Sequence, residues 1–269
     1  MLVSALLDTV YTNIRSLVIG KMYSASDLAF YNQGDKLPSV IVNNINVSID
    51  SVLLPTLAKE QEDRERVKNM TRRAIKTSTY IMAPLMMGLA FCAKPLVQII
   101  LTEKWLRCVP FLQIFCITYM FQPIHTANLN AIKAMGRSDL FLKLEIAKKI
   151  VGMILLLSTM WFGVMAMAYS LLVSSVLSQI INSWPNRKLL NYGYLEQLKD
   201  VIPSIALAVF MGFCVNLVCL LELSNIVTLL IQIPLGAVIY IVSSALLHLE
   251  SFKYLMDMIR PMTRKIIRK

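Results

Sequence analysis

Charged residues are scarce in this 269-residue sequence, and so are the residues that most enzymes use for chemistry. Only 16% of the side chains are charged, and the chain has two histidines and nine glycines. No glycine-rich phosphate loop, HExxH motif or GxSxG motif occurs, so hydrolysis, group transfer and nucleotide-driven pumping have little support. The five cysteines form no CxxC pair and lie in or beside apolar runs. We therefore expect a protein that is not an enzyme and that needs no cofactor and no metal.

Apolar residues are abundant instead. They make up 57% of the sequence, and the mean hydropathy is +0.62. A soluble globular domain is about 45–50% apolar and about 25% charged, so this balance predicts an all-α integral membrane protein. The net charge of +11 would suggest a nucleic-acid partner in a soluble protein. In a membrane protein it reflects basic cytoplasmic loops, and we expect no nucleic-acid partner.

About eight transmembrane helices are expected, because a spanning helix needs about 20 mostly apolar residues. The stretch 150–186 has no charged residue and the length of two spans, with a hairpin at Gly163. The predicted helices cover approximately residues 1–20, 25–57, 77–101, 108–133, 144–162, 164–186, 201–221 and 224–248. We group the first six as a transporter bundle (1–186) and the next two as additional helices (187–249). Residues 250–269 are expected to form a basic cytoplasmic tail.

Basic residues are distributed unevenly between the expected loops. The segments 59–76, 133–149, 187–199 and 250–269 hold 21 of the 27 lysines and arginines. By the positive-inside rule these segments face the cytoplasm, which also makes both termini of a multi-pass inner (plasma) membrane protein cytoplasmic. The first residues lack the basic region and cleavage site of a secretory signal. A chain that opens inside a polar span is expected to be the later part of something longer.

Polar side chains follow one face of each of the first two helices. In the first helix Asp8 and Arg15 share a stripe, and in the second a stripe runs from Lys36 to Asp50. At about 100° per residue each stripe falls within an arc of roughly 80°. Charges inside a membrane usually face a bundle interior or an aqueous cavity, so we predict a translocation path here. The candidate path residues are Asp8, Arg15, Lys36, Asn43, Asn44, Asn46 and Asp50.

Other interpretations of these polar residues stay open. Asn and Ser side chains also join neighbouring helices by hydrogen bonds, and Arg15 and Lys36 are long enough to reach the outer interface. We expect Lys94 to reach that interface too. His125 lies in mid-span beside Pro123 and is expected to be a hydrogen-bonded packing residue, with proton transfer as the alternative. Residues 59–76 are expected to form a surface helix that leads into the next span.

Several segments resemble a known family of transporters. The run IGKMYSASDLAFYNQGDKLP (19–38) and the run LLPTLAKEQEDRERVKNMTRRAI (53–75) resemble consecutive stretches of bacterial polysaccharide flippases. NLNAIKAMGRSDLFLKLEIAKK (128–149) is similar to a cytoplasmic turn of that family, and FGVMAMAYS (162–170) to one of its hairpins. The ordered set resembles the Wzx-like oligosaccharide flippases, members of the multidrug/oligosaccharidyl-lipid/polysaccharide exporter superfamily.

The resemblance implies a fold of about 12 to 14 helices in two bundles around a central cavity. The chain is similar only to the second bundle, from the seventh helix to the fourteenth. The implied activity is translocation of an undecaprenyl-diphosphate-linked oligosaccharide across the inner membrane for surface polysaccharide or lipopolysaccharide synthesis. The implied partners are this lipid-linked substrate, membrane lipid and, if the first bundle is encoded separately, that N-terminal half. In this interpretation Arg15 binds the diphosphate, the asparagines of the second helix contact sugar hydroxyls, and Asp8 and Asp50 hold Arg15 or a coupling cation.

Three alternatives compete with this interpretation. A multidrug/cation antiporter of the same superfamily would favour acidic cavity residues, whereas Arg15 and Lys36 favour an anion. An integral-membrane enzyme would need a large outer loop or a site rich in His, Asp or Arg, and the expected outer loops are short. A non-functional membrane remnant would insert and transport nothing.

Overall fold

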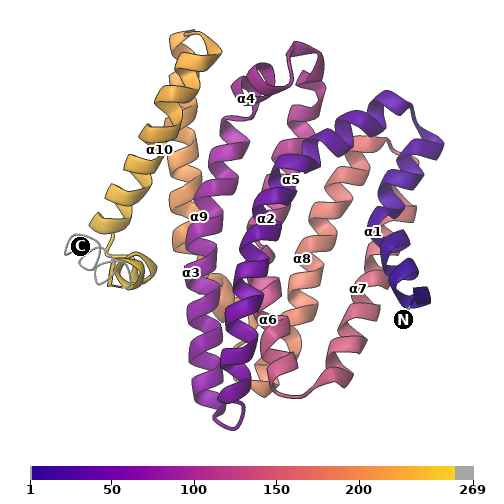
Figure 1. The fold of residues 1–269 in the computed structure, drawn as a ribbon, viewed down its shortest axis with the longest axis vertical. Helices are drawn as coiled ribbons and strands as arrows, with labels where there is room; N and C mark the ends of the chain where they lie inside the picture. Colours follow the sequence, from indigo (N-terminus) through magenta and orange to yellow (C-terminus); the bar gives the residue numbers. More distant parts are fainter. Residues whose placement is uncertain (1, 258–269) are drawn as a thin grey trace.

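The computed structural model describes the fold of residues 2–257, with the side chains of residues 2–10 and 12 outside the description. Within this range the chain is built of helices and contains no strand (Figure 1). The α-helices are α1 (Leu2–Met22), α2 (Ala25–Lys59), α3 (Arg64–Phe91), α4 (Ala93–Ile100), α5 (Val109–Met120), α6 (Gln122–Ala134), α7 (Ser138–Thr159), α8 (Val164–Leu189), α9 (Tyr194–Asn216) and α10 (Asn225–Leu246). Short 3-10 turns cover Glu103–Cys108 and Leu217–Leu221, and residues 250–257 are helical.

Helices occupy every segment in which a span was expected. By length and composition, α2, α8, α10 and the stretch Tyr194–Leu221 could each cross a membrane. The pair α3 and α4 passes the same test together, with a bend of 69° between them. The remaining helices are either short, as α5 and α6 are, or carry polar and charged residues, as α1 and α7 do. The all-helical membrane class is confirmed, whereas the count of eight spans stays a prediction.

Two helices differ in extent from the expected ones. The surface helix expected over residues 59–76 is continuous with the following span, since α3 runs without a break from Arg64 to Phe91. The expected helix over 108–133 is divided at Phe121, two residues before Pro123, which lies in the first turn of α6. Proline supplies no backbone N–H and is well tolerated at a helix start, which explains the break at this point.

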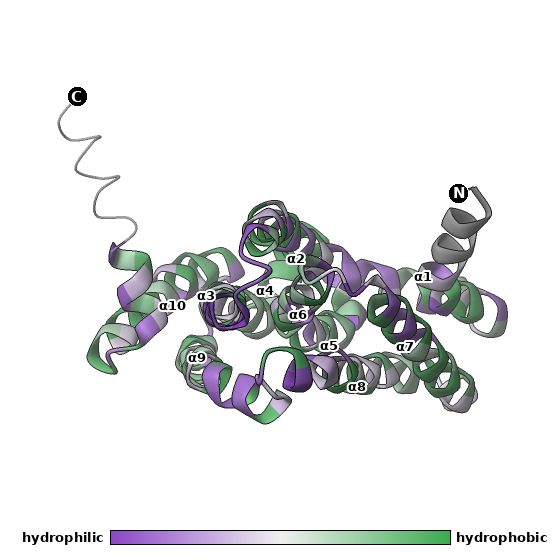
Figure 2. Ribbon diagram, turned by 90° about the horizontal axis from the view of Figure 1, so that it is seen from below, coloured by the Kyte–Doolittle hydropathy of each residue, from purple (hydrophilic) through white to green (hydrophobic). Residues whose placement is uncertain are grey.

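An apolar stripe on α7 faces outward although the helix also carries charges. The exposed residues recur at helical spacing and are Leu142, Ile146, Ile150, Ile154 and Leu157. Hydrophobic colour also extends along the outer helices when the bundle is seen from below (Figure 2). Because large apolar faces of this kind are rare on water-soluble monomers, these surfaces are suited to contact with lipid.

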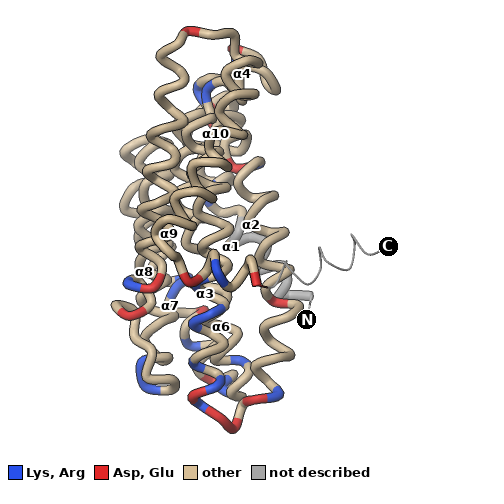
Figure 3. Tube along the Cα trace, turned by 90° about the vertical axis from the view of Figure 1, so that its left-hand side faces the viewer, with Lys and Arg blue, Asp and Glu red and all other residues tan. Residues whose placement is uncertain are grey.

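The helices pack around three apolar clusters. One lies between α3, α5 and α9 around Met82 and Met211, a second between α2, α6 and α9 around Leu57, and a third between α1, α5 and α8 around Ile19. The α2–α3, α6–α7 and α8–α9 connections lie at the lower end of the bundle, where most charged residues gather (Figures 1 and 3).

A tyrosine near the end of α1 ties the first helix to the α7–α8 hairpin. The Tyr23 hydroxyl donates to the carbonyl oxygen of Met160 at 2.6 Å and accepts from the backbone N–H of Gly163 at 2.9 Å. Gly163 has a φ of 102°, a backbone conformation that residues with a side chain rarely adopt. The hairpin is therefore both turned by a glycine and held by a hydroxyl from a distant part of the sequence.

Close contact between α2 and α5 depends on Gly34. A Cβ atom added there would lie 2.7 Å from Cβ of Phe111 and 2.9 Å from the backbone nitrogen of Leu112. Because neither atom can move without shifting α5, we expect Gly34→Ala to lower the free energy of unfolding by about 1–3 kcal/mol. Denaturation of the purified protein by SDS, followed by circular dichroism, measures this loss. Gly88→Ala is the matched control, since the nearest atom to its new Cβ is 3.9 Å away. An equal loss in both variants would contradict the packing explanation.

Candidate functional site

Arg15 and Lys36, two of the predicted path residues, line the same cavity. This Arg15 cavity has a volume of about 590 Å³ and is bounded by α1, α2, α5, α7 and α8. Besides apolar residues, its lining includes the polar side chains Tyr11, Asn13, Arg15, Ser16, Tyr31, Asn32, Asp35, Lys36, Tyr119 and Ser174. Its volume falls in the range of about 300–1,000 Å³ that is typical of ligand pockets.

Contacts with α8 hold the Arg15 guanidinium in the cavity wall. Its Nη1 donates to the carbonyl oxygen of Met167 at 2.8 Å and to Oγ of Ser170 at 2.7 Å. Both bonds use a single nitrogen, and Nε and Nη2 have no acceptor among the described residues. A guanidinium with free donors in a fixed orientation matches the paired oxygens of a phosphate or carboxylate.

The charges that line the cavity sum to a small positive excess. Lys36 and Arg15 contribute two cations, and Asp35 contributes one carboxyl group. Oδ1 of Asp35 accepts a hydrogen bond of 2.6 Å from the hydroxyl of Tyr119 on α5. Ser16 donates to Oδ1 of Asn32 at 2.9 Å, which joins α1 to α2 at the rim. Cations, amides and phenol rings together favour an anionic ligand that also carries hydroxyl groups.

The other predicted path residues lie elsewhere along α2. Asn46 accepts a hydrogen bond of 3.1 Å from Thr126, and Asp50 accepts one of 2.7 Å from Asn130, both on α6. Asn43 is exposed, and Asn44 lines a different groove between α2 and α3. The side chain of Asp8 lies outside the described residues. The structure therefore brings together Arg15 and Lys36 and connects Asn46 and Asp50 to a neighbouring helix.

A second polar cluster, which the sequence interpretation did not assemble, surrounds His125. Nδ1 of its ring lies 3.0 Å from Nδ2 of Asn182, and Nε2 lies 3.4 Å from Nζ of Lys148. Lys148 also donates to Glu145 at 2.5 Å. A neutral imidazole accepts at one nitrogen and donates at the other, so the Asn182 amide must present its oxygen to the ring if Lys148 is protonated. Lys148, expected in a basic loop, is buried in α7.

A buried amide network joins α6, α8 and α9. Asn128 and Gln197 exchange two hydrogen bonds, of 2.7 Å and 3.0 Å, between their side-chain amides. Nδ2 of Asn186 donates to Oδ1 of Asn128 at 2.6 Å, and Ser183 donates to Oε1 of Gln197 at 3.0 Å. All four residues are fully buried. We interpret the network as structural: polar groups in an apolar environment need partners, and these hydrogen bonds hold the three helices together.

Comparison with known proteins gives related sequences from polysaccharide pathways. Residues 1–110 match the family model described as polysaccharide biosynthesis protein. The chain is 25% identical over 179 residues to an uncharacterized membrane protein in the cps region of Klebsiella pneumoniae, covering 66% of this chain and 37% of that protein. It is 24% identical over 182 residues to the teichuronic acid biosynthesis protein TuaB of Bacillus subtilis (strain 168), covering 67% and 38%. It is 25% identical over 179 residues to the lipopolysaccharide biosynthesis protein WzxC of Escherichia coli (strain K12), covering 66% and 36%.

Among solved structures, the fold is similar to that of the lipid II flippase MurJ in an inward closed conformation. The TM-score is 0.70 at 18% identity, and the likeness covers 88% of this chain and 51% of that one. The chain thus spans about half of this structural relative and less than two fifths of the curated relatives. The chain is therefore a multi-pass membrane bundle whose fold is similar to about half of that flippase structure. The sequence matches confirm the resemblance to the Wzx-like polysaccharide transport proteins.

Proposed function

We propose that the chain is one bundle of a flippase that moves an undecaprenyl-diphosphate-linked oligosaccharide across the inner membrane. The product would supply the synthesis of a surface polysaccharide or lipopolysaccharide. The observation that carries this proposal is the Arg15 cavity, in which a guanidinium with free donors lies among amide and phenol side chains. The names of the relatives support the pathway, and the fold of the structural relative supports the mode of transport.

In the proposed complex the side chains that line the cavity contact different parts of the substrate. Arg15 binds the diphosphate through Nε and Nη2, and Lys36 adds a second positive charge. Asn13, Asn32 and Tyr119 supply donors and acceptors for sugar hydroxyls. The lipid tail stays in the bilayer, because apolar chains gain nothing from entering a polar cavity. An antiporter for organic cations is less well supported, since the lining holds two cations and a single carboxyl group.

The organisation of the complete transporter follows as part of the same proposal. Residues 1–186 form the bundle, 187–249 add two helices, and 250–269 form a cytoplasmic tail. The basic lower end of the bundle (Figure 3) would face the cytoplasm, and both termini would be cytoplasmic by the positive-inside rule. The exposed face of α2 that carries Asn43 and Asp50 is where a first bundle, encoded separately or in the same gene, would close the path.

Direct binding tests the proposal with the chain as it exists. We expect the chain in lipid nanodiscs to bind an undecaprenyl-diphosphate oligosaccharide at least 10-fold more tightly than undecaprenol, because charge-assisted hydrogen bonds contribute about 1.5–3 kcal/mol each. Fluorescence polarisation with a labelled sugar, competed by each unlabelled lipid, gives both affinities. Equal competition by undecaprenol would refute a diphosphate site, and stronger competition by a hydrophobic organic cation would favour the antiporter.

A further inference from the structure

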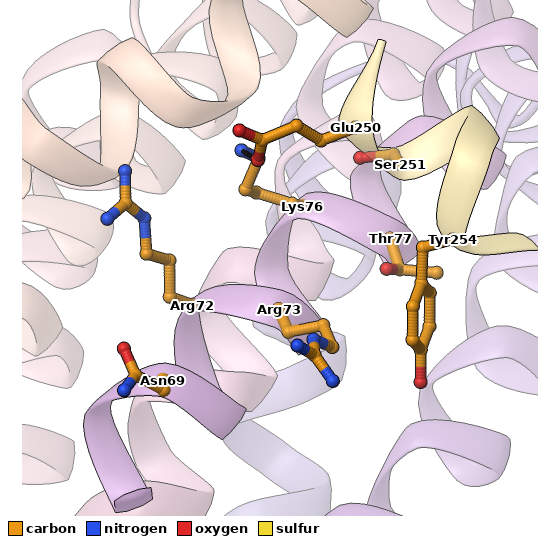
Figure 4. A pocket seen from close by; sticks show the side chains of 8 residues that line it. All are labelled: Asn69, Arg72, Arg73, Lys76, Thr77, Glu250, Ser251 and Tyr254. Carbon is orange, nitrogen blue, oxygen red and sulfur yellow. Dashed lines mark hydrogen bonds and ion pairs between the residues drawn. The ribbon is translucent and has the colours of Figure 1, made fainter. Parts of the chain in front are cut away.

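A groove between α2 and α3 lies outside the Arg15 cavity and opens beside a cluster of cations. The groove has a volume of about 590 Å³, and a pocket of about 390 Å³ adjoins it. Arg73, Thr77 and Tyr254 line both, so the two hollows lie side by side and share these side chains. The pocket is walled by the lower part of α3 and by the helical segment 250–257 (Figure 4).

Most charges around the pocket neutralise one another, with one exception. Arg72 binds Asp200 through two hydrogen bonds of 2.7 Å, and Lys76 is paired with Glu250. The hydrogen bond from Lys76 lowers the pKa of Glu250, which therefore stays ionised. Arg73 has no ion pair and no hydrogen bond among the described residues, and its guanidinium carbon lies 4.9 Å from the ring centre of Tyr254. Among the described residues that line the pocket, Arg73 (Figure 4) is thus the one cation without an acidic partner, and it also lines the groove.

The walls of the groove are mostly apolar, although polar residues of α2 take part in them. Three polar residues of α2 line it, but each donates its side-chain hydrogen bond back to its own helix. Asn44 donates to Val40, Ser48 to Asn44 and Thr56 to Val52. Side chains such as Ile45, Val52 and Ile81 complete a surface suited to a hydrocarbon chain. Backbone bonding of this kind removes the need for polar partners within the groove.

The dimensions of the groove match one leaflet of a membrane. From Arg73 to Ile81 it rises eight residues along α3, which corresponds to about 12 Å. The hydrocarbon layer of one leaflet is about 15 Å, half of the bilayer core. Arg73 lies just before residue 77, where the predicted apolar span begins, and Tyr254 is of a residue type that is enriched at the membrane interface.

We propose that this site binds an anionic glycerophospholipid such as phosphatidylglycerol. The phosphate lies on Arg73 beside Tyr254, and one acyl chain occupies the groove between α2 and α3. The bound lipid fills the space between these helices and ties the segment 250–257 to α3. This inference does not depend on the proposed transport function, because it involves a different cavity and a different lipid.

Native mass spectrometry of the full chain in detergent tests the assignment, with dioleoyl phosphatidylglycerol and dioleoyl phosphatidylcholine as probes. We expect phosphatidylglycerol to bind at least 10-fold more tightly, and Arg73→Gln to remove that preference. Arg64→Gln is the matched control, since Arg64 is an exposed arginine on the same helix that does not line the groove. Ile81→Trp fills the upper groove and is expected to weaken binding of both lipids.

Three results would overturn the proposal. Equal losses in Arg73→Gln and Arg64→Gln would mean that only the general positive charge attracts the lipid. Competition by water-soluble glycerol phosphate at concentrations similar to those of the lipid would mean that the groove takes no part. Displacement of phosphatidylglycerol by an equimolar polyprenyl diphosphate, lost in Arg73→Gln, would assign the site to that lipid instead. Circular dichroism on each variant verifies that it is folded.

Discussion

Replacing Arg15 by alanine is expected to weaken binding of the diphosphate-linked oligosaccharide by about 10- to 100-fold. The variant loses the only guanidinium in the Arg15 cavity, and with it two nitrogens that have no other acceptor among the described residues. Hydrogen bonds to charged groups contribute about 1.5–3 kcal/mol, which corresponds to this range. The polarisation assay in nanodiscs measures the change. In a complete transporter that contains this bundle, the same substitution should abolish glycan export.

Two further variants separate a phosphate contact from a loss of structure. Arg15→Lys keeps the charge but cannot form the paired hydrogen bonds of a guanidinium, so we expect intermediate affinity. Arg107→Ala removes an exposed arginine outside the cavity and should bind like the parent chain. If Arg15→Ala binds the diphosphate lipid as tightly as the parent, the phosphate role of Arg15 is wrong. Circular dichroism verifies that each variant retains its helices.

Replacing Asn128 by alanine is expected to cost about 2–4 kcal/mol of unfolding free energy. The substitution leaves Gln197, Asn186 and Ser183 without their shared partner in a fully buried place. A buried polar group without a partner costs about 1–3 kcal/mol, and several are affected here. SDS-induced unfolding measures the loss. Asn43→Ala is the matched control because Asn43 is exposed and should change stability by less than about 0.5 kcal/mol.

A double-mutant cycle distinguishes the amide network from simple loss of packing. We expect the combined loss in Asn128→Ala/Gln197→Ala to be smaller than the sum of the two single losses, because each single variant leaves the other amide without its partner and the double variant removes both amides. Strictly additive losses would show that the two amides do not depend on each other. Apolar contacts alone would then account for the packing of α6 against α9.

Helix positions followed from the sequence because apolar length and local turn signals determine them. The hairpin at Gly163 was predicted from an uncharged stretch with the length of two spans, and the structure has its turn there. The charged segment 59–76 was predicted to form a surface helix leading into the next span, because its acidic and basic residues alternate at helical spacing, and α3 is helical from Arg64 onward. The division at Phe121 was not predicted, because Pro123 was expected to lie in the middle of one span over 108–133.

The contacts between side chains could be predicted from the sequence less well than the positions of the helices. Arg15 and Lys36 were both named as path residues, and they line one cavity. Asn44 was named as well, but it lies about 100° around α2 from Asn43 and faces the α2–α3 groove. Asp35 and Tyr119, which are 84 positions apart, meet only because α2 and α5 pack together. Contacts of such sequence separation depend on tertiary packing, and helical periodicity contains no information about them.

The bonds of Tyr23 make α1 and the α7–α8 hairpin a mechanical unit. Its single hydroxyl has a donor bond to Met160 and an acceptor bond from Gly163, so sliding α1 along the hairpin would break both at once. Arg15 reaches α8 from the same helix, two turns earlier. We therefore expect a displacement that opens or closes the cavity to carry α1, α7 and α8 together, so that the contacts of these helices with α2 and α5 change instead.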